Sequence, residues 1–209
     1  MVDKHKQLTV LYAPKKPYKK ILFLGYDRKK TEIIDALINA NCEVHYSKGV
    51  IKRVDYDLII CFGYREIIDV PTLGKIKCPI INLHISYLPY NRGSHPNFWS
   101  FFDKTPSGVT IHLIDEGIDT GPIIYQKIVN FDQNEKTFLK TYKKLIVEIE
   151  KLFLTNLSDI LSGSWKSIPQ KGEGTVHYIN QLPSEFSGWD TDIEGELGKL
   201  RDLLGEKND

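Results

Sequence analysis

The sequence predicts an α/β fold in which a mostly parallel sheet is flanked by helices, with a short C-terminal extension. The first observation is that short apolar runs alternate with amphipathic segments along the first half of the chain. Such alternation is typical of β-α-β units, whose strands pair in parallel. The second is composition: of 209 residues, 41% are hydrophobic and 26% are charged, a mix that can bury a core and argues against disorder.

Four apolar runs in the first half are each short enough to form one buried strand. Two of them stop at glycines, Gly25 and Gly63, which interrupt a strand pattern. The four runs are residues 20–25, 43–46, 56–62 and 78–84.

A helix is expected over residues 31–41, between the first two strands. Thr31 is its expected N-cap and Asn41 its expected terminator. Apolar residues recur there at helical spacing, which gives the helix a face to bury. They are Ile33, Ile34, Leu37 and Ile38.

The second half of the chain departs from this alternation of strands and helices. Residues 97–103 form a dense aromatic turn of helix, and two strands with a glycine-rich connection follow. A long amphipathic helix is expected to open with a capping-box-like start from Asp132 to Glu135. A short helix closes the chain after an irregular stretch. The ranges are 108–114 and 122–129 for the strands, 132–160 for the long helix, 162–187 for the irregular stretch and 194–204 for the closing helix.

Charge and cysteine usage exclude several classes of protein. Lys and Arg number 28 against 27 Asp and Glu, so no overall basic field points to nucleic acid as a partner. No apolar run approaches the ~18 residues of a membrane span, and the lysine-rich residues 1–20 lack the apolar core of a secretory signal. Three cysteines, Cys42, Cys61 and Cys78, are expected to be reduced thiols. They form no metal motif, and a cytoplasmic location is expected.

Polar residues emerge where the fourth predicted strand ends. Asn82 and His84 are two residues apart, so their side chains point to the same face of the sheet. Ligands of open α/β sheets bind beyond the carboxyl ends of strands, which makes the pair a candidate site. Taken alone, a satisfied core Asn and His is an equally good interpretation. The irregular loop from Ser86 to Gly93 favours a site, because function concentrates in such loops.

A second polar loop spans residues 114–122. Gly117 and Gly121 bracket Asp119 and permit tight backbone geometry. The alternative is an acidic surface turn. Together with Asn82 and His84, however, the loop supplies a useful set: an amide for a developing oxyanion, an imidazole for proton transfer, and a carboxylate to orient the imidazole. No Ser or Cys lies in a nucleophile elbow, so the set fits acyl transfer by direct attack.

Four motifs in order resemble the folate-dependent formyltransferases. They are Asn82-Leu83-His84 with Leu88-Pro89, then Arg92-Gly93, then Gly108-Val109-Thr110, then Asp119-Thr120-Gly121. The clear match covers residues 80–126, and the preceding half fits the same fold more loosely. The resemblance implies a Rossmann-like formyltransferase core that uses N10-formyltetrahydrofolate as formyl donor.

The resemblance also implies site residues. Asn82, His84 and Asp119 correspond to the catalytic trio, in which the first two stabilise a tetrahedral oxyanion and Asp119 assists proton transfer. The pterin of the folate is expected against the loop after the third strand and the loop before Asp119. Those cofactor-binding positions are Phe62, Gly63, Tyr64, Arg65 and Ile67, with Asp115 and Ile118.

The acceptor amine differs among members of this family. Methionyl-tRNA formyltransferases carry a further β-barrel domain, whereas the residues after Asn130 look mostly helical or irregular. Glycinamide ribonucleotide transformylases use a Gly- and Ser-rich phosphate loop where this chain has residues 25–31. Residues 90–101 resemble the small sugar N-formyltransferases, which act on an amino sugar carried on a nucleotide. Asn91, His95 and Asn97 are then the expected sugar contacts.

The expected organisation is a catalytic core over residues 1–160, with residues 1–19 as an N-terminal arm, and a C-terminal extension over residues 161–209. The extension is a candidate contact to the acceptor or to a second copy in a homodimer. A phosphoribosylglycinamide formyltransferase and a non-catalytic folate or nucleotide binding module remain alternatives. His112 is expected to be a satisfied structural histidine, and at least two of Phe98, Trp99, Phe101 and Phe102 are expected to pack in a core.

Overall fold

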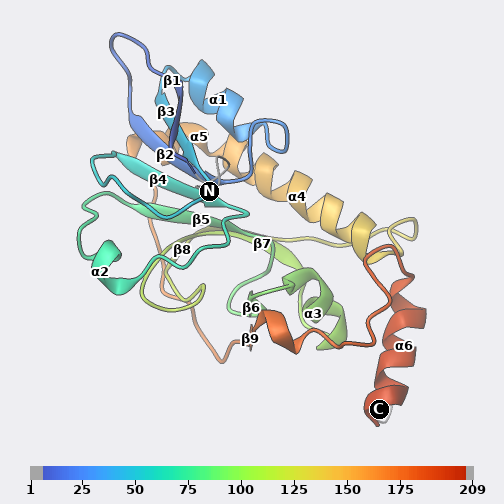
Figure 1. Ribbon diagram of the computed structural model, residues 1–209. Helices are drawn as coiled ribbons and strands as arrows, with labels where there is room; N and C mark the ends of the chain where they lie inside the picture. The colour runs from blue at the N-terminus through green and yellow to red at the C-terminus, as the bar shows by residue number, and fades with distance from the viewer. Residues whose placement is uncertain (1–6, 206–209) are drawn as a thin grey trace.

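The computed structural model describes residues 7–205 and is built around one seven-stranded sheet (Figure 1). The strands lie in the order β1-β3-β2-β4-β5-β7-β8. Strands β3, β2, β4 and β5 pair in parallel, and β1, β7 and β8 add antiparallel pairs at the two sides. The strands are β1 Thr9–Tyr12, β2 Lys20–Gly25, β3 Glu43–Ser47, β4 Leu58–Phe62, β5 Ile80–His84, β7 Gly108–Leu113 and β8 Ile123–Ile128. The predicted α/β class and the four parallel strands are therefore confirmed.

Alternate residues of the central strands divide between two apolar cores. In β2, Ile21 and Phe23 lie in one core, whereas Leu22 and Leu24 lie in the other. Both sets are buried, because each face of the sheet is covered. The larger core lies under α1 Ile33–Asn39, α4 Phe138–Thr155 and α5 Leu157–Ser162, which gather on one side of the sheet (Figure 1). The smaller core lies under the short helix α2 Val70–Leu73 and neighbouring loops.

The long helix differs from its predicted range. It begins after Thr137, whose side chain accepts a hydrogen bond from the backbone N–H of Lys140, and Asp132 to Glu135 instead form a separate turn. It ends at Asn156, where φ is −105° and ψ 14°, and α5 follows as a separate helix. The capping-box-like start was therefore misplaced, because Asp132 and Glu135 close their own turn and both pair with Lys144.

Two N-terminal details also differ from expectation. The N-cap of α1 is Glu32, one residue after the predicted Thr31, although the Thr31 hydroxyl still accepts a hydrogen bond from the N–H of Ile33 at 3.2 Å. Within the predicted N-terminal arm, β1 pairs antiparallel with β3 at the sheet edge. Its residues are mostly exposed, so no buried apolar run marked it as a strand.

Aromatic residues tie the C-terminal helix to the rest of the chain. Helix α3 Pro96–Phe102 places Phe98 and Trp99 against α6 Ile193–Leu204, where Leu197 and Leu200 are buried. Phe98 is fully buried and Trp99 is 7% exposed, so the expected core packing is confirmed. The stretch before α6 is irregular as predicted, apart from the short strand β9 Val176–His177, which pairs with β6 Arg92–Gly93, and one turn of 3₁₀ helix, Ile179–Gln181.

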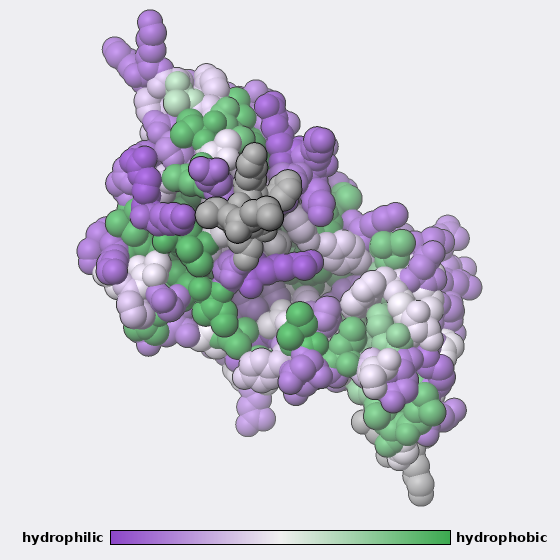
Figure 2. Space-filling model, viewed as in Figure 1, coloured by the Kyte–Doolittle hydropathy of each residue, from purple (hydrophilic) through white to green (hydrophobic). Residues whose placement is uncertain are grey.

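Polar and apolar residues intermix over the face of the molecule in Figure 2, and one apolar area lies over the end of α6. Leu203 and Leu204 are more than half exposed there. Within residues 7–205, no helix is both long and apolar enough to cross a bilayer.

Candidate active site

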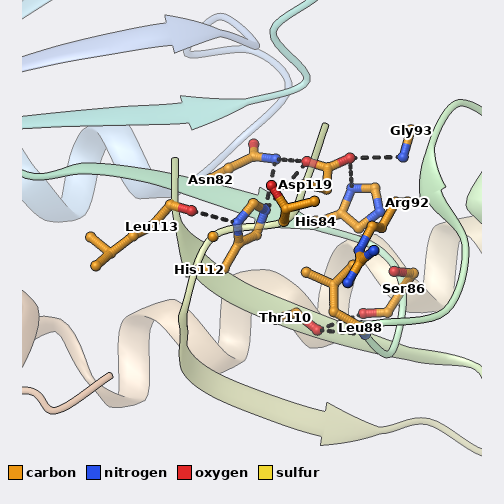
Figure 3. Close-up of polar contacts among 12 residues, drawn as sticks. Asn82, His84, Ser86, Leu88, Arg92, Gly93, Thr110, His112, Leu113 and Asp119 are labelled. Carbon is orange, nitrogen blue, oxygen red and sulfur yellow. Dashed lines mark hydrogen bonds and ion pairs between the residues drawn. The ribbon is translucent and has the colours of Figure 1, made fainter. Parts of the chain in front are cut away.

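The carboxyl end of β5 and the loop between β7 and β8 meet in one polar cluster (Figure 3). Asn82 and His84 leave the same face of β5, and both turn toward the carboxylate of Asp119. Nδ2 of Asn82 lies 3.0 Å from Oδ1 of Asp119, and Nδ1 of His84 lies 3.7 Å from Oδ2. The three predicted catalytic residues are thus brought together by strand alternation and one loop.

Four groups surround the Asp119 carboxylate. The backbone N–H of Gly93 donates to Oδ2 at 2.8 Å, and Nε2 of His112 lies 3.3 Å from Oδ1. Burial by itself raises the pKa of this carboxyl, but nearby groups outweigh it, first the charge of His84 and also the hydrogen bond from the Gly93 N–H. The pKa of Asp119 is therefore held well below its ordinary value. The side chain is ionised throughout the physiological range and is an acceptor only.

The amide of Asn82 is oriented by this network. Nδ1 of His112 lies 2.7 Å from the carbonyl oxygen of Leu113, so that nitrogen carries the hydrogen of a neutral ring. Nε2 of His112 is then an acceptor, and Nδ2 of Asn82 lies 3.2 Å from it. Both N–H groups of Asn82 are engaged, one with His112 and one with Asp119. Asn82 reaches a substrate oxygen only by turning a donor away from this network.

The imidazole of His84 is fixed from the opposite side. Its Nε2 lies 3.1 Å from the backbone carbonyl of Asn91, and His84 is only 7% exposed. A ring nitrogen facing a carbonyl must donate, so Nε2 carries a hydrogen. Nδ1 is left as the atom that faces Asp119 and can exchange a proton.

Two neighbouring cavities lie beside the cluster. The smaller, of about 200 Å³, is lined by all three members of the trio. The larger, of about 620 Å³, lies between α3, α4 and the C-terminal stretch, and its volume is in the range of small-molecule sites. Both cavities share a wall made of Tyr26, Gly63, Tyr64, Ile85, Gly93 and Pro96.

Comparison with known proteins identifies the family. The formyl transferase family model matches residues 19–156, the range that supplies the trio and most of the sheet. The chain belongs to the formyl transferase family.

Individual formyl transferases resemble the chain to different extents. It is 28% identical over 198 residues to the methionyl-tRNA formyltransferase of Clostridium botulinum, covering 90% of this chain and 62% of that protein. It is 31% identical over 126 residues to the dTDP-4-amino-4,6-dideoxyglucose formyltransferase of Mycobacterium bovis, covering 58% of this chain and 51% of that protein. The chain therefore spans less than two thirds of the length of these curated relatives.

Solved formyl transferase structures match over more of their length. The formyltransferase PseJ from Anoxybacillus kamchatkensis, solved with UDP-4,6-dideoxy-4-formamido-L-AltNAc and tetrahydrofolate, is 40% identical with a TM-score of 0.77. The match covers 86% of this chain and 98% of that one. A 4-N formyltransferase from Francisella tularensis shares the fold, with a TM-score of 0.71 and 24% identity over 87% of each chain.

The residues expected to bind folate fall into two groups in this formyl transferase. Phe62 lines the smaller cavity, Arg65 lines the larger one, and Gly63 and Tyr64 line both. The others line neither cavity: Ile67 is 87% exposed, Ile118 is 43% exposed, and Asp115 caps its own loop by accepting from Gly117 N–H and the Thr120 hydroxyl. The family resemblance brought these two loops into the prediction, but only the turn of the backbone decides which of their side chains face inward.

Of the three expected sugar contacts, two line the larger cavity and one does not. His95 and Asn97 line the larger cavity. The expectation for the Asn91 side chain is wrong, because Asn91 is fully buried and its amide bonds to the hydroxyls of Thr105 at 2.8 Å and Thr175 at 3.2 Å. Its contribution to the site is the backbone carbonyl that holds His84.

Three other residues of the site, His112, Tyr26 and Tyr142, were not anticipated as functional. His112 is buried and satisfied as predicted, but it also contacts Asp119. The hydroxyl groups of Tyr26 and Tyr142 form a hydrogen bond of 2.6 Å in the cavity wall. Burial, and to a smaller extent this hydrogen bond, raises the pKa of Tyr142. Trp189 reaches the cavity from the C-terminal stretch. Trp189 belongs to the C-terminal extension, which was predicted from the sequence as a candidate contact to the acceptor.

Replacing Gly63 with Ala is expected to destabilise the protein by about 2 kcal/mol and to narrow both cavities. Gly63 has a φ of +66°, and an added Cβ would come within 2.4 Å of the Tyr26 ring. Urea unfolding would measure the loss. Gly198→Ala is the matched control, because a Cβ there meets nothing within 4 Å. Equal stability of Gly63→Ala and wild type would contradict this account of the shared wall.

Proposed function

We propose that this formyl transferase transfers the formyl group of N10-formyltetrahydrofolate to the amine of a nucleotide-linked amino sugar. The observation that carries the proposal is the arrangement of the trio in a small cavity that shares a wall with a larger one. Support comes from the 40% identical PseJ, solved with a UDP-linked formamido sugar and tetrahydrofolate. The two cavities give separate room for a formyl donor and an acceptor, and the smaller one is lined by Asn82, His84 and Asp119.

The smaller cavity has the chemistry needed by a folate. Apolar side chains from Leu83, Ile85 and Ile146 and the ring of Tyr26 give flat walls for an aromatic ring system. The exposed glycine Gly63 leaves backbone groups open to the edge of such a ring. When bound there, the folate supplies the formyl group that is transferred.

The trio then has a defined task for each atom. Nδ2 of Asn82 and Nδ1 of His84 both lie against Asp119 and can turn toward an oxygen that gains negative charge. The ionised Asp119 orients the His84 imidazole through Nδ1. The imidazole can take the proton released by the attacking amine and return it to the folate nitrogen as the bond from that nitrogen to the formyl carbon breaks. Hydrogen bonds at such sites tighten once substrate is present.

The larger cavity has features suited to a nucleotide sugar. Asn97 is 4% exposed and donates from Nδ2 to the carbonyl of Phe138, while its Oδ1 has no hydrogen-bond partner within residues 7–205. A hydroxyl or N–H of the acceptor would satisfy this oxygen. His95 and Trp189 form an aromatic wall, with ring centroids 5.3 Å apart. Arg65, exposed in the same lining, offers a positive charge to a diphosphate.

Replacing Trp189 with Ala is expected to raise KM for the acceptor by about tenfold with kcat and KM for the folate close to wild type. The ring is 39% exposed in the cavity and packs on Phe186 at 4.8 Å and His95 at 5.3 Å, so a sugar or base would lose a large apolar contact. Steady-state kinetics with each substrate varied in turn measures the effect.

Two controls accompany that variant. Trp189→Phe keeps an aromatic ring in the wall and should recover most of the affinity. Tyr18→Ala removes an aromatic side chain that is 54% exposed and lines neither cavity, so its kinetics should equal those of wild type. An unchanged acceptor KM for Trp189→Ala would argue against acceptor binding in the larger cavity.

The direct test of the proposal is an acceptor panel. The protein is incubated with N10-formyltetrahydrofolate and, separately, UDP- and dTDP-linked amino sugars, glycinamide ribonucleotide and Met-tRNA, and formylated product is followed by mass spectrometry. Product from an amino sugar supports the proposal. Product from glycinamide ribonucleotide or Met-tRNA alone overturns the sugar assignment, and folate binding without turnover on any amine favours a binding module.

A further inference from the structure

The residues that follow α5 run alongside the active site. Ile168 exchanges two backbone hydrogen bonds with Ile123, at 2.8 and 2.9 Å, next to the Asp119 loop. Further on, the N–H of Arg92 donates to the carbonyl of Thr175 at 3.0 Å, and the N–H of Ser94 donates to the carbonyl of His177 at 2.8 Å. These residues lie beyond the range 19–156 that the family model matches. They are nevertheless bonded to the segment that follows the Asp119 loop and to the loop that follows β5.

Gln170 is the one side chain of this stretch that bridges the two loops within the described chain. Its Nε2 donates to the carbonyl oxygens of Asp119 and Gly121, each at 2.8 Å. Its Oε1 accepts from Nε of Arg92 at 3.1 Å and from Nη2 of Arg92 at 2.7 Å. All the hydrogen-bonding atoms of the amide are therefore used, and each contacts a loop that carries a site residue.

Asp119 needs such support because its backbone is in an uncommon conformation. Its φ is 50°, in the left-handed region that side chains adopt at a cost unless their surroundings impose it. The carboxylate is held by Asn82 and by the N–H of Gly93. The backbone carbonyl of the same residue is held by Gln170. The side chain and main chain of Asp119 are thus fixed by different partners.

We propose that Gln170 is a positioning residue for Asp119, acting through the main chain of the loop and through Arg92. The inference rests on the proposed function, since it concerns the same active site. A glutamine fits this position because it presents two donors on one atom and an acceptor on the other. A glutamate would still pair with Arg92 but would turn an oxygen toward the carbonyls of Asp119 and Gly121, which also only accept. Gln170→Glu is therefore a near-isosteric variant that keeps the pairing with Arg92 and removes the links to the carbonyls of Asp119 and Gly121.

The first measurement is steady-state kinetics of Gln170→Glu and Gln170→Met with the acceptor that wild type uses. Misplacing a reacting group by a fraction of an ångström lowers turnover strongly, so kcat should fall about 10- to 100-fold. KM for folate and acceptor should stay within about twofold of wild type, because Gln170 lines neither cavity. Lys171→Ala, an exposed neighbour, is the matched control and should behave as wild type.

The second measurement combines Gln170→Glu with Asp119→Asn. If Gln170 acts through Asp119, the double variant should be no slower than Asp119→Asn alone, since the effects of coupled residues do not add. Multiplied losses would overturn the proposal, as would a kcat within twofold of wild type for both Gln170 variants. A fall in kcat that tracks a large loss in Tm for Gln170→Met, with Gln170→Glu active, would assign Gln170 a purely structural role and also overturn it.

A crystal structure of Gln170→Glu separates this proposal from the proposed function. Wild type that turns over no amine would refute the function, yet the position of Asp119 would remain measurable. We expect φ of Asp119 to leave its value near 50° and the distance from Oδ2 to Nδ1 of His84 to grow beyond 3.7 Å. An Asp119 loop that superposes on that of wild type would overturn the positioning role whatever the acceptor.

Discussion

Replacing His84 with Ala lowers kcat by about 10³-fold in our expectation, within the range that a positioned acid or base contributes. The ring is buried, held through Nε2 by the Asn91 carbonyl, and directed through Nδ1 at Asp119. No neighbouring side chain can take its place as a proton carrier, since His112 directs Nδ1 at the Leu113 carbonyl and engages Nε2 with Asn82. Single-turnover rates with saturating folate and acceptor measure the loss of the chemical step.

Two controls show whether the lower kcat of His84→Ala comes from the missing imidazole. Imidazole added to His84→Ala should restore part of the rate, because truncation leaves a space of the right shape beside Asp119. His45→Gln removes another buried histidine, which contacts Tyr56 and Glu43 and lines neither cavity, and it should keep the wild-type rate. Turnover of His84→Ala within tenfold of wild type would refute its catalytic role.

Replacing Asp119 with Asn is expected to lower kcat by a similar factor of about 10³ and to destabilise the fold by about 2 kcal/mol at pH 7. Both carboxylate oxygens face hydrogen-bond donors, Asn82 on Oδ1 and the Gly93 N–H on Oδ2. Either orientation of an asparagine places its NH₂ against one of them. Stopped-flow kinetics and urea unfolding measure the two effects, and Asp115→Asn in the exposed part of the same loop is the matched control.

The stability difference between wild type and Asp119→Asn should depend on pH with a definite sign. The folded pKa of Asp119 lies below its unfolded value, so the ionised carboxylate contributes its full stability above a pH of about 4. That contribution is lost as pH falls through the folded pKa. The two proteins should therefore differ most near neutrality and approach each other in acid. A difference that grew on acidification would contradict the assigned direction.

Strand periodicity explains why the catalytic trio was predictable. A buried parallel strand leaves one polar face at its carboxyl end, so the spacing of Asn82 and His84 was enough to place them together. Asp119 followed from its glycine-bracketed loop and from the order of the motifs. Each of these inferences depends on residues close in sequence or on a pattern that a whole family shares.

Helix ends and cavity-lining residues were harder to predict, because several neighbouring residues of suitable type could fill the same role. Asp132 and Thr137 both make reasonable N-caps, and packing of Phe138 against α3 and α6 coincides with the later start. Asn91 has the residue type of a sugar contact, yet Thr175, 84 residues away, accounts for its burial. Burial of a polar side chain depends on such distant partners.

The sequence by itself determined the α/β class, the parallel strands and the family to which the chain belongs, and it predicted Asn82, His84 and Asp119 as the catalytic residues. Only the tertiary structure decided which hydrogen bonds hold these three residues. Asn82 donates to His112 and Asp119, and the Asn91 carbonyl orients His84. Gln170 holds the backbone of the Asp119 loop. The physical reason is the range of the interactions. Periodicity and turn chemistry act over a few residues, whereas hydrogen-bond direction and cavity shape are set where segments distant in sequence meet.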